Sequence, residues 1–564
     1  MTMKRNITHI LWVAALLLVS CQQEEFPRPD IGKAVSLSIT VTDSGYHTDS
    51  DAKNPQEPQT RAVESGYNTE FIEGDACGFY LVRVGGLVYE NVKLTARRGE
   101  GGLIWQADEG VEINGGLRSE AYFLYYPYRE NIAGEVNAFA GDDMDFFKQI
   151  IDNWQPAADQ SDYASYTASD LMTAIGEVIP DAEGKPTLHF SMSHQMALAE
   201  IRMPTTRYEF TNTTGRRVPD YISSSPVDFS KGDVLPYNFE NGVYRYIVRP
   251  NGDQVPTIKG RFVSKDLFFD LDKEFVISPN IKPSNYKIYK VDGAPVKEEN
   301  HNLQRGDFLL SDGSLVSKDN QLTTRQKAQV SAIVFWSPFE TSTEGRFTPA
   351  RLTDDKIMST YHPHCTHGLA LAIKNVNNGT QWQSDGFVES VSDWQAGAGF
   401  SHPMSSDFVS IASRTDPFAN INKIYGYQNT VLLRLYNAHC NANGKAKYAV
   451  HPVVALDEFE KTNQAPAGST GWFVPSEKEL HILCYKDVDN IMNVFGESFN
   501  DTRIIVNTSL SAAGGDLVEN NHWSSSESHK DIYNGGAYLM NFEECYAVPV
   551  KKSNYGVVRA VCAF

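Results

Sequence analysis

The chain has 564 residues and a formal net charge of -20. A single hydrophobic core stops growing well below this length, so we expect more than one domain. Hydrophobic residues make up 41% of the sequence, with 27 Tyr and 29 Phe, which predicts globular, β-rich domains. The acidic balance excludes binding of nucleic acid through a basic surface, because neutralising phosphates requires clustered Lys and Arg.

Residues 1–20 have the features of a bacterial secretory signal. Two basic residues precede an apolar stretch, Leu11–Val19, that is too short to span a bilayer. The segment Leu18–Cys21 matches the lipobox of bacterial lipoproteins, in which the signal is removed before the cysteine and the thiol receives a diacylglycerol. We therefore expect Cys21 to carry a lipid that holds the precursor on the outer membrane. A signal with an incidental cysteine is the alternative.

The leader, residues 21–61, contains one strand pattern. Val35, Leu37, Ile39 and Val41 alternate with Ser and Thr, so a strand here places all four apolar side chains on one face. Such a strand is suited to covering a hydrophobic core.

A polar tether, residues 43–60, follows this strand and ends at Arg61. It has almost no apolar residue to bury, so we expect it to be accessible to proteases. The other arginine of the leader, Arg28, precedes Pro29, which makes it a poor site for trypsin-like enzymes. The sequence therefore predicts proteolytic processing between Arg61 and Ala62, with an incidental loop arginine as the alternative.

Short β-rich runs separated by turns continue from Gly78 to Phe275, a spacing typical of β-sandwiches. Aromatic and glycine-rich pieces lie among them in a defined order: Phe71, Gly74-Asp75, Gly78-Phe79-Tyr80, Tyr89, Asn91, Trp105, Tyr122 to Tyr128, Asp170-Leu171-Met172, Phe190, His194 and Met196-Ala197-Leu198. In this order the pieces resemble the fimbrillin family of Bacteroidetes, over about residues 20–300.

The resemblance implies a subunit of a type V pilus with two transthyretin-like β-sandwich domains, which we place at residues 62–195 and 196–300. It also implies a lipoprotein precursor whose leader strand is cut away after an arginine, so that a strand donated by another fimbrial subunit fills the groove. A physical argument that does not depend on the resemblance also favours replacement of the leader strand. A sandwich that loses a strand exposes unpaired backbone groups and apolar side chains, and an incoming strand restores both.

Residues 301–564 form a further predicted domain. The pieces Gly471 to Ser476 and Trp523 to Glu527, with the final strand runs, resemble the C-type-lectin-like α+β domains appended to Bacteroidetes surface proteins. The sequence lacks the calcium-binding triplets of sugar-binding animal lectins, so calcium-dependent sugar binding is not expected. We expect the last residues, 555–564, to form part of the core of this domain. This favours a tip subunit, which accepts a strand but has none to donate.

One loop gathers possible metal ligands. His362, His364, Cys365 and His367 are all residue types that bind zinc. Their spacing matches no closed tetrahedral pattern, so we expect no metal there.

A possible ligand face lies near the C-terminus. Trp523, Ser525 and Glu527 would combine an aromatic platform for a sugar ring with polar groups. Packing of Trp523 in the core is the favoured alternative.

The sequence carries no His-Glu-x-x-His, no Gly-x-Ser-x-Gly and no phosphate-binding glycine loop. The lectin-like fold is shared with formylglycine-generating enzymes, which need paired cysteines, and Cys545 and Cys562 could pair. The main prediction is a fimbrial tip adhesin without enzyme activity or cofactor, which binds a host or microbial glycan or protein at the cell surface. The alternatives are a permanently anchored lipoprotein that captures glycan and, third, such an enzyme.

Overall fold

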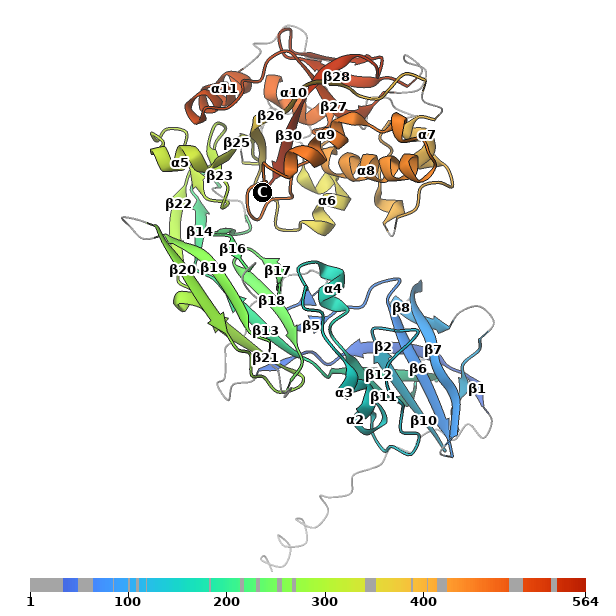
Figure 1. Ribbon diagram of the computed structural model, residues 1–564. Helices are drawn as coiled ribbons and strands as arrows, with labels where there is room; N and C mark the ends of the chain where they lie inside the picture. The colour runs from blue at the N-terminus through green and yellow to red at the C-terminus, as the bar shows by residue number, and fades with distance from the viewer. Residues whose placement is uncertain are drawn as a thin grey trace, which may run out of the picture. The chain divides into compact units, whose positions relative to one another are not determined.

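Figure 1 shows the computed structural model of the chain. It describes residues 34–48, 64–84, 86–99, 102–107, 111–117, 119–181, 184–213, 218–229, 234–250, 256–265, 270–339, 351–386, 389–402, 404–412, 423–485, 501–528 and 535–564. Cys21, Arg61 and Ala62, the expected lipid and processing sites, lie outside these residues.

The chain divides into two compact units. Unit 1 comprises residues 1–199, 246–256 and 279–287, and unit 2 comprises residues 200–245, 257–278 and 288–564. The three-domain division expected from the sequence, with boundaries after residues 195 and 300, is a finer one and stays a prediction.

Unit 1 is built around a seven-stranded sheet. Its strands lie in the order β2 (Ser38–Asp43), β12 (Pro186–His194), β11 (Met172–Pro180), β10 (Glu120–Tyr126), β6 (Ala76–Arg83), β7 (Gly86–Gly99) and β8 (Gly102–Ala107). β2 runs parallel to β12, whereas all other neighbours are antiparallel. β2 also lies beside β8. The two outer strands of the sheet therefore approach each other around one core.

Shorter elements complete this unit. The two-stranded sheets are β1 (Val35–Ser36) with β9 (Asn114–Gly115) and β4 (Glu64–Ser65) with β5 (Asn68–Thr69). Between β10 and β11 come α2 (Asp143–Phe146), α3 (Lys148–Asn153) and α4 (Tyr163–Thr167). Phe146 of α2 stacks on Phe123 of β10 at 3.9 Å between ring centroids, which anchors this helical segment to the sheet.

Three smaller sheets occupy the middle of the chain. The five-stranded sheet has the order β17 (Tyr237–Glu240), β18 (Val243–Val248), β13 (Ala197–Arg202), β21 (Asn285–Lys290) and β3 (His47–Thr48). The boundaries between the two units fall within its strands β13, β18 and β21. The two three-stranded sheets are β15 (Tyr221–Ser224), β14 (Thr205–Phe210) and β22 (Val296–His301), and β16 (Val227–Asp228), β19 (Ile258–Lys265) and β20 (Asp270–Ile277).

An eight-stranded sheet forms the centre of the C-terminal region. Its order is β24 (Leu315–Val316), β23 (Phe308–Leu310), β25 (Val330–Trp336), β26 (Leu369–Gln381), β30 (Tyr555–Ala563), β27 (Asn521–Glu527), β28 (Ala537–Asn541) and β29 (Tyr546–Val550). The helices of this part are α5 (Thr324–Gln329), α6 (Lys356–Tyr361), α7 (Val391–Ala396), α8 (Gly426–Ala442), α9 (His451–Glu460), α10 (Glu477–Tyr485) and α11 (Asp501–Ala513). Single 3-10 turns are η1 (Val291–Gly293), η2 (Leu352–Asp354), η3 (Ser405–Asp407) and η4 (Ala446–Tyr448).

Two hydrophobic cores lie on the opposite faces of this sheet. Side chains of a strand alternate between faces, and in β25 Val334 joins the core that contains residues of α8 and α9, whereas Ile333 joins the core that contains residues of α10 and α11. Because helices cover both faces, the central strands are apolar throughout rather than alternating.

The prediction of a mainly β chain is confirmed. The possible disulfide between Cys545 and Cys562 is wrong, because both residues are buried thiols. The two side chains face different cores, Cys562 with α8 and α9 and Cys545 with α10, so the sheet separates them. Among the described residues, the helices are all too short or too polar to cross a membrane.

Replacing Leu371 by Ala tests the dependence of the C-terminal region on its central strands. Leu371 lies in β26 and has no exposed surface, so Leu371→Ala should lower the free energy of unfolding by about 2–5 kcal/mol, measured by urea denaturation. The matched control is Asn378→Ala, at an exposed position of the same strand, with an expected change within about 0.5 kcal/mol. Equal effects of the two variants would contradict this core assignment.

Candidate functional site: the leader strand and its groove

The leader strand is an edge strand of the unit 1 sheet. Ser38 to Asp43 of β2 pair in parallel with Thr187 to Met192 of β12, and Val35 and Ser36 of β1 pair with β9. Leu37 lies between β1 and β2, and its N–H donates to the carbonyl of Ile113 at 3.1 Å. The leader thus satisfies backbone groups at an edge that would otherwise be unpaired.

The alternation expected from the sequence is confirmed. Leu37 and Ile39 are 7% and 3% exposed and belong to the unit 1 core, with Val35 and Val41 packed partly against it. The intervening Ser36, Ser38 and Thr42 are exposed. Full burial of each Leu or Ile side chain is worth about 1.5–3 kcal/mol, so the leader contributes to the core that it covers.

A buried charged cluster closes the end of β2. His194, at the end of β12, lies between two carboxylates: its Nδ1 is 2.8 Å from Asp170 Oδ2, and its Nε2 is 3.1 Å from Asp43 Oδ1. The His194 and Asp43 side chains are 0% and 2% exposed. The leader therefore supplies one of the two charges that flank a buried imidazole.

Further contacts hold this end of the leader. Asp43 accepts the N–H of Gly45 at 2.9 Å and that of Thr69 at 2.5 Å. Tyr46 stacks on the His194 ring with 3.7 Å between centroids. Since Thr69 and His194 both follow Arg61 in the sequence, Asp43 joins the leader to the part of the chain beyond the expected cleavage site.

The charges of this cluster stabilise one another. Burial alone would lower the pKa of His194, but the flanking carboxylates, Asp170 foremost, raise it to about 10. Burial alone would raise the pKa of Asp43, but its contacts with His194 and with the backbone N–H of Thr69 lower it. An imidazolium between two carboxylates is the arrangement that these shifts favour.

The leader makes a second pairing beyond the cluster. His47 and Thr48 of β3 pair in parallel with Asn285 and Tyr286 of β21, and the His47 N–H donates to the carbonyl of Ser284 at 2.8 Å. The leader is thus an edge strand twice, in the seven-stranded and in the five-stranded sheet.

The C-terminal strand has the opposite placement. β30 lies between β26 and β27 in the eight-stranded sheet, antiparallel to the first and parallel to the second (Figure 1). Phe564, the last residue, is 1% exposed, and its carbonyl accepts the N–H of His367 at 2.7 Å. As the sequence suggested, the C-terminal residues are part of the core of their own sheet.

The expected metal candidates contact separate partners. His362 Nε2 is 3.0 Å from the Tyr427 hydroxyl, His367 Nε2 is 2.8 Å from the carbonyl of Pro219, and His364 is exposed. Burial raises the pKa of the Cys365 thiol to about 12, which disfavours the thiolate that binds zinc. Within the described ranges, no group of three or more His, Cys, Asp or Glu is placed to hold a metal ion.

The expected ligand face near the C-terminus is not a surface. Trp523, Ser525 and Glu527 of β27 are all at most 1% exposed, which corrects the expectation that they line an accessible face. The Trp523 indole donates to the carbonyl of Thr380 at 2.7 Å, as a core tryptophan does. Glu527 forms a buried ion pair with Lys552 and accepts the N–H of Ser392 at 2.7 Å.

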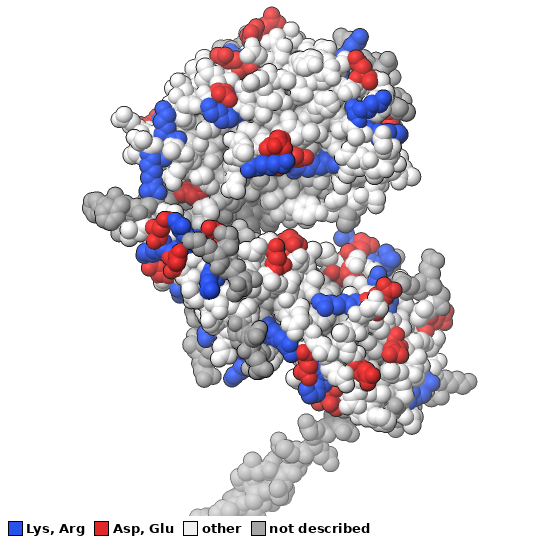
Figure 2. Space-filling model, in the orientation of Figure 1, with Lys and Arg blue, Asp and Glu red and all other residues white. Residues whose placement is uncertain are grey.

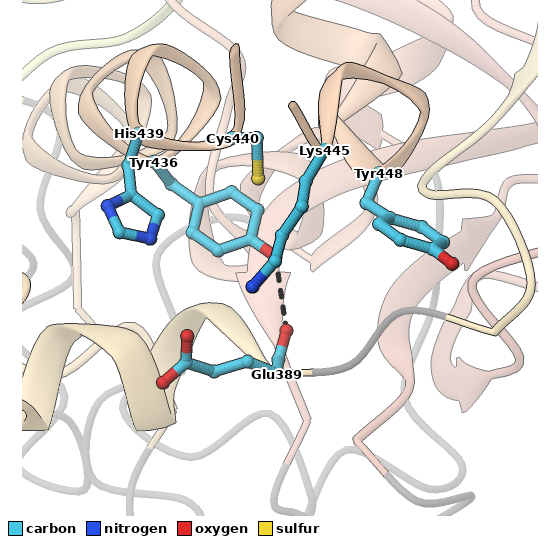
Figure 3. A pocket seen from close by; sticks show the side chains of 6 residues that line it. All are labelled: Glu389, Tyr436, His439, Cys440, Lys445 and Tyr448. Carbon is cyan, nitrogen blue, oxygen red and sulfur yellow. Dashed lines mark hydrogen bonds between the residues drawn. The ribbon is translucent and has the colours of Figure 1, made fainter. Parts of the chain in front are cut away.

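Figure 3 shows a small pocket in the C-terminal region, with a volume of about 250 Å³ including its open mouth. Its lining comes from α8, from η4 and the residue before it, and from the loop before α7: Glu389, Tyr436, His439, Cys440, Lys445 and Tyr448. Burial raises the pKa of the Cys440 thiol, and the Tyr436 hydroxyl donates to the carbonyl of Glu389 at 3.1 Å. The thiol is therefore not an activated nucleophile.

Charged side chains of both signs are interspersed on the face shown in Figure 2. Ion pairs among the described residues include Arg207 with Glu298 and Arg434 with Glu460. This face offers no continuous basic surface for phosphate groups.

Comparison with known proteins shows that most of the chain is similar to fimbrial proteins. No family model matches the chain. Over 555 residues it is 28% identical to the Bacteroides ovatus protein named "Putative fimbrium tip subunit Fim1C", and the match covers 94% of each protein. The chain is a homologue of that protein. A crystal structure of a fimbrial protein from Bacteroides ovatus has the same fold, with a TM-score of 0.50 and 24% identity over 94% of this chain and 99% of the other. The resemblance to fimbrial proteins inferred from the sequence is confirmed.

Sequence reasoning missed the charged cluster. His194 and Asp170 were recognised only as pieces of the family pattern, and Asp43 only as the start of the tether. The three residues lie up to 151 positions apart, and no local pattern connects them.

The cluster predicts that the stability of the paired leader strand depends on pH. Because the pKa of His194 is raised from 6.5 to about 10, its protonation stabilises the fold fully below pH 6.5, and this stabilisation is lost as the pH rises toward 10. At the acid end, the lowered pKa of Asp43 keeps its contribution intact above pH 3.8. His194→Gln should therefore accelerate amide hydrogen exchange in β2, relative to the unmodified chain at the same pH, most strongly between about pH 4 and 6.5.

His189→Gln is the matched control. His189 also lies in β12 and contacts the leader, but through the neutral hydroxyl of Thr40 at 3.0 Å. Its effect on exchange should not decline between pH 6.5 and 10. A decline of the same size in both variants would refute the role of the buried ion pairs.

Proposed function

We propose that the chain is a fimbrial subunit that occupies the tip of a pilus and acts there as an adhesin. The observation that carries the tip position is the placement of β30 between two strands of its own sheet. A subunit in the stalk must both accept a strand and offer one. This chain has an exchangeable edge strand at its N-terminus and a fully committed strand at its C-terminus.

The proposed route begins with a lipoprotein precursor. Cys21 carries the lipid and holds the precursor at the outer membrane, and a protease then cuts between Arg61 and Ala62. The leader strand leaves the edge of β12, and a strand from another fimbrial subunit takes its place. The parallel β2–β12 pairing and the buried Leu37 and Ile39 support this step, since an incoming strand must restore the same backbone pairs and apolar contacts.

The adhesive part of the proposal concerns the C-terminal region. In this proposal, residues 62–195 and 196–300 form the two fimbrillin sandwiches, and residues 301–564 form a C-type-lectin-like domain that binds a host or microbial glycan or protein. The mixed sheet with helices on both faces supports a separate α+β region there. The ligand surface is to be sought away from the buried Trp523, Ser525 and Glu527.

Two other functions make different predictions. A permanently anchored lipoprotein that captures glycan would keep its leader. An enzyme of the formylglycine-generating kind would need a cysteine pair, but Cys545 and Cys562 face different cores. If the chain were such an enzyme, replacing both cysteines by Ser should abolish its enzyme activity.

Processing can be tested by sequencing the N-terminus of protein shed from the cell surface. The mature chain should begin at Ala62, and Arg61→Ala should leave the leader attached because the favourable arginine is gone. Arg28→Ala is the matched control and should not change the mature N-terminus. Finding only lipidated full-length protein at the surface would favour the permanently anchored alternative.

Termination of assembly can be tested with the chain cut after Arg61. Since β30 cannot leave its sheet without unfolding it, the cut chain alone should stay monomeric in size-exclusion chromatography at any concentration. A concentration-dependent ladder of oligomers would contradict the tip position, because it would require this chain to donate a strand.

A further inference from the structure

The cleavage proposed after Arg61 would remove one member of the buried charged cluster. Asp43 belongs to the leader, whereas Thr69, Asp170 and His194 belong to the mature chain. Loss of Asp43 leaves the Thr69 N–H and the His194 Nε2 without the carboxylate that accepts from both, at 2.5 Å and 3.3 Å from Asp43 Oδ2. Both groups would then be aimed at one position at the end of the empty groove.

Leaving the His194 Nε2 unpaired is costly because it is fully buried, whereas Thr69 is half-buried. A buried donor without a partner loses about 1–3 kcal/mol, and more when it is charged. The His194 side chain is fully buried, with Asp170 on its other side at 2.8 Å. An incoming strand with only apolar side chains would fill the core but not this position.

We propose that the groove selects a donor strand that places a carboxylate at the position of Asp43, between Thr69 and His194. This inference rests on the proposed function and adds a chemical rule for the partner. Many strands with alternating apolar residues could fill the groove. The requirement for a carboxylate distinguishes among these strands.

The register fixes where the carboxylate must lie. Leu37, Ile39 and Val41 face the core at alternate positions, and Asp43 is the next residue on the same face, opposite Met192 of β12. The partner strand therefore carries alternating apolar residues followed, two positions after the last, by the acidic group. Shifting the strand by one residue would place the carboxylate on the solvent face.

Two sources provide the same chemistry. The carboxylate can be an Asp side chain within the donor strand, or the α-carboxylate of a strand whose chain ends at this position. The first continues past the cluster and retains a pairing like that of His47 with Asn285, whereas the second ends there.

The test uses the full chain cut after Arg61 and fluorescent peptides that compete with the seated leader, followed by native mass spectrometry. The first probe is the leader sequence 34–48, and the second is the same peptide with Asp43→Asn. Because a hydrogen-bonded carboxylate is lost, the Asn peptide should need about tenfold or more higher concentration to displace the leader. The peptide with Ser38→Ala, changed at an exposed position, is the matched control and should displace like the first probe.

Two further peptides distinguish the sources of the carboxylate. Both end at position 43 with Asp43→Gly, one with a free carboxylate and one with a C-terminal amide. Stronger displacement by the free acid than by the amide would show that the α-carboxylate of a chain end can take the place of the Asp43 side chain. Equal weak displacement by the two would restrict the rule to an Asp side chain.

His194→Gln in the protein provides the specificity control. In this variant the Asp and Asn peptides should displace the leader equally, since the imidazolium that discriminates them is gone. The inference is overturned if the two peptides already act equally on the unmodified protein, or if the discrimination persists in His194→Gln. If the Asp and Asn peptides displace the leader equally, the proposal that the groove accepts a donor strand is still supported. If neither peptide displaces the leader, that proposal is overturned together with this inference.

Discussion

The outer edge of β12 is the constraint on which the rest of unit 1 depends. A strand at a sheet edge presents unpaired N–H and C=O groups, and here the neighbouring core side chains would be uncovered as well. The leader satisfies both needs at once, with six paired residues in β2 and the buried side chains of Leu37 and Ile39. Because β2 also lies beside β8, its loss would open the core between the two outer strands of the sheet.

The two ends of the chain treat strand pairing in opposite ways. At the N-terminus, the pairing strand is at an edge, is short and is followed by a polar tether. At the C-terminus, β30 has a neighbour on each side, and its alternate side chains enter two cores. An edge strand can be exchanged while its sheet persists, but a central strand cannot, and the proposed one-way assembly depends on this difference.

The sequence predicted what depends on local pattern and missed what depends on distant contacts. The alternation of Leu37 and Ile39 with serines determined both the strand and its buried face, because the two-residue period requires nothing from elsewhere. The commitment of residues 555–564 was also predictable, since a mostly apolar run, interrupted only by Arg559, needs cover on both faces. The Asp43–His194 contact joins β2 to the end of β12 across 151 positions, and only the fold brings the two together. Trp523 illustrates a different limit: its residue type suited either a ligand platform or a core, with the core favoured, and only its burial in the structure decides between them.

The parallel pairing of β2 with β12 has a mechanical consequence. A strand that replaces β2 in the same register lies along the sheet edge, so a pull directed along its axis loads the backbone pairs from Ser38 to Asp43 together in shear. Peeling would instead break them one after another, each against a small force. A tip subunit held through this groove would therefore resist the drag of flowing liquid far better than the modest number of its hydrogen bonds suggests.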